Sequence, residues 1–327
     1  MSVRKTESRL PQGLQATDLG EAIVAPDGRC ALVSYTSSPL AAGRENMYVV
    51  FITDAGLAGS VHSFEWTFIE NGGTPAVSST DFGQQTYTAA AEGSLDIGIR
   101  MLDAGAAEQA SISFSQDIGP LNDALETLIA DANNNPGPGM GNPDVLRELV
   151  NDLNPYYGTV LLTTPEAGNG FKKFLFSTIN DGLIQRKAPD RYYQLDQVAA
   201  SINSGETDFV SSIAPGLGVA AVRLSLVAMM LPPASIPYTE LPPTSAENAA
   251  ADEQIRIKLG ALSENDRIDM FNLVRFPKSN VKLCGKLLEA LRDKFFAGVN
   301  FDDVLAKMSG TMSDWIILNY NKGPLKR

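Results

Sequence analysis

The sequence predicts an α+β protein of two domains, with an N-terminal antiparallel β-sandwich followed by an all-α domain. Short segments in which apolar and polar residues alternate fill residues 19–118, a Pro- and Gly-rich run follows at 133–143, and helical periodicity dominates from residue 154 onward. The predicted boundaries are an N-terminal tail at 1–18, the sandwich at 19–118, a helix and linker at 119–142, and the helical domain at 143–327.

Seven segments of the first domain have the alternation and flanking turn residues of β-strands. They are residues 21–25, 30–36, 47–53, 61–70, 85–90, 94–102 and 110–116. Strands spaced by about a dozen residues are typical of an antiparallel sandwich. Phe64, Trp66 and Phe68 fall on one face of their strand, so we expect Trp66 to fill the core.

A Trp strand, a short loop, the Thr-Tyr-Thr segment at 86–88, a turn and an alternating strand follow one another in this region. In this order it resembles the Ig-like sandwiches of the PKD type. The resemblance implies an adaptor that spaces or binds. A carbohydrate- or protein-binding surface on the sandwich is therefore one functional hypothesis.

The composition excludes several classes of function. The 327 residues are 44% hydrophobic and 20% charged, as in soluble globular proteins, and a net charge of -12 disfavours a nucleic-acid partner. The longest apolar run, 217–231, contains Arg223 and is too short to insert in a membrane. The first residues lack the apolar core of a signal peptide, which predicts cytoplasmic synthesis, with export as part or cargo of a particle as the alternative.

The sequence contains few cysteine and histidine residues, the usual ligands of zinc and haem iron. Cys30 and Cys284 lie far apart in sequence and His62 is the one histidine, so we expect no metal and no cofactor. A lone histidine beside a core strand is typical of a surface or packing residue.

The second domain has apolar residues at helical spacing in eight segments. They are residues 170–184, 192–202, 217–231, 251–262, 265–274, 279–295, 301–308 and 313–320. Gly, Pro or a capping residue separates them, and a long Pro-rich loop interrupts the domain at 231–248.

Four motifs of this domain occur in the order found in soluble lytic transglycosylases. They are QVAASINSGETDF at 197–209, PGLGVAAVR at 215–223, FPKSNVKLCGKLLEALRDKF at 276–295 and ILNYNKGP at 317–324. The domain therefore resembles the lysozyme-like fold of those enzymes. The resemblance implies a C-terminal lysozyme-like domain that meets the glycan strand of peptidoglycan.

The catalytic position of that family is altered. Asn203 falls where the resemblance implies the catalytic glutamate, and Ala221 falls where it implies a glutamine. An amide cannot act as the proton donor of glycoside cleavage, so the resemblance implies a pseudoenzyme. Glu206 lies three residues after Asn203, near the same helix face, and is the alternative acid and base. Asp208 and Glu240 are weaker candidates.

The resemblance also implies a sugar-binding site. Tyr320 and Asn321 correspond to residues that line the glycan subsite, while Gly216 and Gly218 would let the backbone approach a sugar. Asn203 belongs to the same substrate-binding set. A helix-terminal tyrosine with an asparagine cap, and a tight glycine turn, are the alternative interpretations.

Two functional hypotheses follow from the resemblance. The first is a peptidoglycan-directed protein that has lost catalysis and serves as a glycan-binding or structural component of a phage-tail-like or contractile assembly. The second is an active lytic transglycosylase or muramidase that uses Glu206 as general acid and base.

Overall fold

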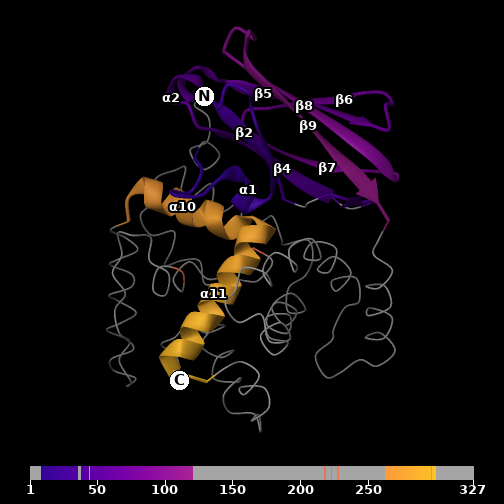
Figure 1. Cartoon of the computed structure of the whole chain (residues 1–327). Helices are drawn as coiled ribbons and strands as arrows, with labels where there is room; N and C mark the ends of the chain where they lie inside the picture. The colour runs from indigo at the N-terminus through magenta and orange to yellow at the C-terminus, as the bar shows by residue number, and fades with distance from the viewer. Residues whose placement is uncertain are drawn as a thin grey trace.

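The computed structural model describes residues 9–35, 38–43, 45–120, 217–218, 222, 227, 262–295 and 297–299. Within these ranges, nine strands form two sheets between residues 21 and 119 (Figure 1). The helices are α1 (Ala16–Leu19), α2 (Ala55–Ser60), α10 (Glu264–Arg275) and α11 (Pro277–Phe295). None of the described helices has the length and apolar character needed to span a membrane.

Sheet A contains four antiparallel strands in the order β1-β2-β4-β7, which are Glu21–Val24, Cys30–Ser34, Glu45–Ile52 and Gln84–Thr88. Sheet B contains five strands in the order β3-β9-β8-β5-β6, which are Leu40–Ala41, Glu108–Gly119, Gly93–Leu102, Ser63–Glu70 and Ala76–Thr80. The pairs of sheet B are antiparallel except that β3 runs parallel to β9. β2 of sheet A and β3 of sheet B are consecutive along the chain.

The two sheets face each other across an apolar core. On β5, Phe64, Trp66 and Phe68 are buried and alternate with partly exposed residues. Phe68 stacks on Trp66 at 6.3 Å and on Tyr87 at 4.4 Å between ring centroids, while the Trp66 indole N–H donates to Thr80 Oγ1 at 2.9 Å. The aromatic rings of one strand therefore fill the space between the sheets, as the alternation predicts.

A buried polar cluster joins the sheets at one end. Tyr48 of β4 donates to Gln116 Oε1 of β9 at 3.0 Å, and Ser34 donates to the same oxygen at 3.2 Å. Asn46 donates to Ser34 at 2.7 Å, and the Gln116 amide donates to Glu21 at 2.9 Å. Because unpaired buried polar groups are costly, this chain of bonds favours a single arrangement of the two sheets.

The two central strands of sheet A, β2 and β4, are buried on both faces. Every residue of β2 is buried, as is every residue of β4 after Glu45. The outer face packs against the N-terminal segment and one C-terminal side chain. This second core contains Ala16, Leu19, Ala31, Val33, Tyr35, Met47, Val49, Phe51 and Phe276. Strands covered on both sides have near-continuous apolar runs instead of alternation, as CALVS and MYVVFI do.

Local sequence features explain where α10 begins and where it ends. α10 begins after Ser263, whose hydroxyl accepts from the Asp266 N–H at 3.1 Å while the Asp266 carboxylate accepts from the Ser263 N–H at 3.3 Å. α10 ends at Arg275 because Phe276 precedes Pro277 and adopts an extended conformation. The break directs Phe276 onto sheet A, with its ring 4.6 Å from Tyr35 and 5.8 Å from Phe51.

The predicted fold class, an α+β protein with a separate all-α lysozyme-like domain, is wrong. The described residues are mostly antiparallel β-sheet in the N-terminal part, and they include only two helices, α10 and α11, near the C-terminus. These helices meet at Phe276, which shares a core with sheet A. The apolar outer face of sheet A must pack against other residues, and Phe276 is one of them. Helical periodicity predicts that residues near 276 form helices, but it does not show that they pack on β2 and β4, more than 200 residues earlier in the chain. The other predicted helices lie largely or wholly outside the described residues.

Candidate functional site

The outer face of sheet B is the open sheet surface of the described sandwich. Three rows of side chains cross its strands. They are Ser79, Glu65, Arg100 and Ser111, then Val77, Thr67, Gly98 and Ser113, then Ile69, Asp96 and Ser115. These residues alternate with the buried core residues of the same strands, so their side chains lie on the solvent face.

Three of the four residues in the middle row are small. Gly98 has no side chain, and a Cβ there would meet the Thr67 Cβ at 3.8 Å, an ordinary contact. The small residues Thr67, Gly98 and Ser113 therefore form a shallow floor between the rows on either side. Most side chains on the face are hydroxyl-bearing or charged, so it is flat and well hydrated.

One row of this face holds a small ion-pair network. Arg100 donates to Glu65 at 2.7 Å and to Glu108 at 2.8 Å. The hydrogen bonds that Arg100 donates to these two carboxylates raise the pKa of Arg100, and the one to Glu108 lowers the pKa of that carboxylate. Exposed pairs of this kind contribute little to stability. Their effect is to hold the charge of Arg100 in place on the surface.

The turn at one end of sheet B is ordered by a carboxylate. Glu70 accepts from the backbone N–H groups of Ala90 at 3.0 Å and Ala91 at 2.6 Å, and from the Tyr87 hydroxyl at 3.2 Å. Burial alone would raise the pKa of Glu70, but these donors together lower it. The 89–93 turn is therefore tied to the end of β5.

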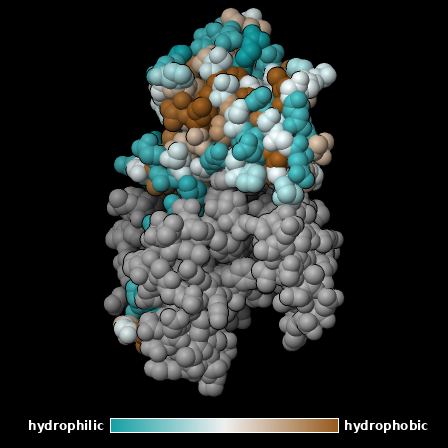
Figure 2. All heavy atoms as spheres, turned by 45° about the vertical axis from the view of Figure 1, so that its right-hand side comes forward, coloured by the Kyte–Doolittle hydropathy of each residue, from teal (hydrophilic) through white to brown (hydrophobic). Residues whose placement is uncertain are grey.

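The remaining surface of the sandwich is mixed. Figure 2 shows hydrophilic residues around separate apolar patches on the visible face. The large hydrophobic residues that are exposed among the described residues are Ile23, Val24 and Val77. All three lie on edge strands, β1 and β6, where backbone groups also face outward.

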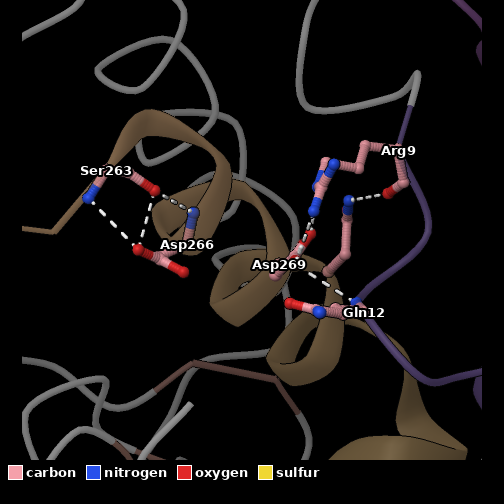
Figure 3. A network of polar contacts seen from close by, with 6 residues as sticks. Arg9, Gln12, Ser263, Asp266 and Asp269 are labelled. Atoms are coloured by element: carbon pink, nitrogen blue, oxygen red, sulfur yellow. Dashed lines mark hydrogen bonds and ion pairs between the residues drawn. The ribbon is translucent and has the colours of Figure 1, made fainter. Parts of the chain in front are cut away.

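The N-terminal strap, residues 9–19, joins the sandwich to α10 and α11. Arg9 Nε donates to Asp269 Oδ1 at 2.7 Å, and the Gln12 N–H donates to Asp269 Oδ2 at 3.1 Å (Figure 3). The Asn272 amide donates to the Arg9 carbonyl at 2.7 Å. Lys278 donates to the Thr17 carbonyl at 2.6 Å, and burial lowers its pKa. These contacts fix the middle of α10 and the first turn of α11 against the strap, although the sequence places residues 1–18 in a tail.

Arg275 lies at the centre of this junction and is 2% exposed. Its guanidinium carbon lies 4.9 Å from the Phe276 ring centroid, 5.2 Å from Phe271 and 5.6 Å from Phe51. Nη1 donates to Gln84 Oε1 at 3.4 Å, and Nε and Nη2 have no hydrogen-bond partner within the structure described. The three rings therefore hold the cation mainly through cation–π contacts. The rings enclose the guanidinium, so we assign Arg275 a packing role.

Gly218 is the one predicted site residue among those described. Its φ is +69°, and a Cβ there would lie 2.6 Å from the Val274 carbonyl oxygen and closer still to the Asn280 amide. Leu217 and Val222 exchange two backbone hydrogen bonds, at 2.7 and 2.9 Å, so the chain turns tightly here. Gly218 thus packs against the start of α11. A role in sugar binding stays a prediction.

The other predicted site residues lie outside the described residues. They are Asn203, Glu206, Gly216, Tyr320 and Asn321, together with the weaker candidates Asp208 and Glu240. Their mutual arrangement therefore stays a prediction. His62 is exposed, and its backbone N–H donates to the Leu102 carbonyl at 2.7 Å. Among the described side chains, no group of three His, Cys, Asp or Glu residues is placed to bind a metal.

The sequence analysis did not identify several residues that hold the strap, sheet A and α10 together. Asp269 belongs to the predicted helical segment 265–274, and Arg275 and Phe276 directly follow it, but none of the three gave a sign of a partner in the sandwich. The detectable signal was in β2 and β4, whose unbroken apolar runs indicate a sheet covered on both faces.

No family model, curated protein or solved structure matches the chain. The resemblance to lytic transglycosylases and to PKD-type sandwiches therefore stays a prediction.

Proposed function

We propose that this protein is a non-catalytic binding or structural component, whose sandwich presents the outer face of sheet B to a partner. The observation that supports the proposal is the difference between the two sheets. The strap and Phe276 cover sheet A, whereas the outer face of sheet B carries three rows of solvent-facing side chains. An open sheet face on a rigid scaffold is a common place for recognition.

The packing of the strap, sheet A and α10 against one another also supports this proposal. The strap, sheet A and the Arg275–Phe276 pair come from opposite parts of the sequence but share one core. A load applied to the face of sheet B would pass through packed side chains into α10 and α11. Such coupling suits a component that must hold its orientation within a larger assembly.

The partner class follows from the chemistry of the face. Sugar rings are usually held on exposed aromatic faces, whereas the rows described here consist mainly of Ser, Thr, Gly and charged residues. The three rows contain no aromatic residue that could stack on a sugar, which favours a protein partner over a glycan. A protein assembly, such as a phage-tail-like particle, is therefore our first choice of partner, and the glycan strand of peptidoglycan is the second.

Fractionation of producing cells tests the proposal. We expect the wild-type chain in high-mass fractions, and T67R should shift it to the size of the free protein because the longer, charged side chain would protrude from the floor of the face. V24R, on the opposite sheet, is the control and should leave the profile unchanged. A wild-type chain found only as the free protein would contradict the proposal.

Incubation with purified cell wall addresses the glycan partner and the enzyme alternative. Retention on insoluble peptidoglycan without release of soluble muropeptides would favour glycan binding. Clearing of a cell-wall suspension by the wild type but not by E206Q would instead establish the enzyme. No clearing, or equal clearing by both proteins, removes Glu206 from consideration.

A further inference from the structure

β6, Ala76–Thr80, is an edge strand whose second side is open. It pairs with β5 through five consecutive residue pairs without a bulge, and within the described sheets it has no strand on its other side. Edge strands carry a row of outward backbone donors and acceptors that can pair with another strand. Ala76, Val77 and Ser79 are exposed, and Val77 is 60% exposed, the largest fraction among the exposed large hydrophobic residues described.

The surroundings of β6 lack the features that usually block edge pairing. Residues 71–80 contain no charged side chain, although the chain as a whole is 20% charged with a net charge of -12. Natural edges are commonly protected by charges, bulges or proline. Pro75 has no backbone N–H, so pairing with another strand would stop before it. Ala76–Thr80 itself contains no charge, bulge or proline.

The other edges of the sandwich are less suited to pairing. β3 contains two residues, and β7 contributes Gln84 to the contact with Arg275 of α10. β1 is four residues long and begins with Glu21, whose carboxylate is engaged with Ser38 and Gln116. β6 is thus the edge that combines length, neutrality and an exposed apolar residue.

We propose that β6 pairs with β6 of a second copy of this chain, antiparallel and related by a two-fold axis at Val77. An isologous contact of this kind needs a self-complementary surface, and a neutral strand meets that need in an acidic protein. The two Val77 side chains lie opposite each other in this register, Ala76 lies opposite Ser78, and Ser79 falls opposite Pro75, where the pairing ends. No two acidic residues of the paired strands therefore come together.

The contact is small, so the association is weak. In this register Ala76–Ser78 of one copy pairs with Ala76–Ser78 of the other, and so short a contact buries much less than the area of about 1,200 Å² or more found in stable interfaces. The pairing therefore appears at high protein concentration, or where many copies are held together in an assembly. The inference goes beyond the proposed function, because it concerns the purified chain and does not depend on the face of sheet B having a partner.

Cysteine cross-linking of the full chain tests the register. Directly opposite residues in an antiparallel pair have Cβ atoms within reach of a disulfide. Under mild oxidation V77C should form a disulfide dimer at least about tenfold faster than V24C, which presents an equally accessible thiol on the β1 edge. Both native cysteines are buried and do not compete.

Sedimentation velocity provides an independent measurement. The wild type and V24K should show the same increase of sedimentation coefficient with concentration, whereas V77K should remain at the monomer value. The proposal is overturned if the wild type does not associate, if V77K associates as the wild type does, or if V77C cross-links no faster than V24C. These outcomes are independent of the fractionation that tests the proposed function.

Discussion

Arg9 and Asp269 lie 260 positions apart in the sequence and form a two-bond ion pair. Arg9 Nε donates to Oδ1 at 2.7 Å and Nη2 donates to Oδ2 at 3.2 Å, while the Gln12 N–H also donates to Oδ2. The hydrogen bond to Asp269 raises the pKa of Arg9. The pair joins the strap to α10, so substitutions at these two residues test that contact directly.

A double-mutant cycle on Arg9 and Asp269 measures this link. We expect R9A, D269A and the double variant to give a coupling energy of about 0.5–1 kcal/mol in urea unfolding, since Arg9 is partly exposed. The coupling should fall in 1 M salt, because screening weakens partly exposed pairs. The local pair Arg29 and Asp27 is the control, and its removal should leave the docking of α10 intact. A coupling of zero would show that this ion pair does not contribute to holding the strap against α10.

Phe276→Ala tests the apolar side of the junction. Phe276 is fully buried between Tyr35 and Phe51, so truncation should cost about 3–5 kcal/mol of unfolding free energy. Ile23→Ala, on the exposed edge of the same sheet, serves as the control and should change little. The free energy of unfolding is measured in urea. A loss under about 1 kcal/mol would show that Phe276 does not contribute to the core of sheet A.

Gly218→Ala and Gly13→Ala form a matched pair. Both glycines have positive φ, +69° and +80°, so each substitution has the same backbone cost of about 1–2 kcal/mol. Only at Gly218 would the new Cβ overlap the Val274 carbonyl and the Asn280 amide, whereas nothing lies within 4 Å at Gly13. We therefore expect G218A to lower the melting temperature clearly more than G13A. Equal shifts would show that the 217–222 turn does not press on α11.

The two native thiols should be unreactive in the folded protein. Cys30 is fully buried, and burial raises the pKa of its thiol to about 11, so little thiolate exists at pH 8. Cys284 is buried in α11. A colorimetric thiol assay should detect neither cysteine in native protein and both in denaturant. Fast reaction of one thiol without denaturant would show that its element opens readily.

The stability of the 89–93 turn should depend on pH through Glu70. Its pKa is lower in the folded than in the unfolded state, so its contribution is present above the unfolded pKa and is lost as the pH falls through the folded pKa. E70Q should flatten the fall in melting temperature at acidic pH. E92Q, on an exposed residue of the same turn region, controls for the loss of one charge. Parallel acid curves for wild type and E70Q would contradict the assignment.

Local pattern predicted individual elements well but not their assembly. The alternation at 61–70 marked β5, and the helical spacing at 265–274 and 279–295 marked α10 and α11. β6 was missed because AVSST has one large apolar residue and no alternation to detect. β3 was missed because two residues carry no pattern.

The candidate site was less accessible to prediction. The residues chosen from the transglycosylase resemblance lie outside the described residues, except Gly218, which packs against α11. The outer face of sheet B consists of small polar residues that occur on any solvent-exposed strand, and single-sequence reasoning gives them no special weight. Their importance appears only when the register places them side by side across three or four strands.

The amino-acid sequence by itself located seven of the nine described strands and helices α10 and α11, and it indicated which side of β5 enters the core and where Pro277 breaks the helical run. These are consequences of side-chain periodicity and backbone sterics over a few residues. Only the tertiary structure decided that Arg9 meets Asp269, that Phe276 covers sheet A, and that β6 is left open at an edge. Those outcomes depend on which apolar faces find one another after the chain collapses, and burial is non-directional, so no local pattern encodes the choice.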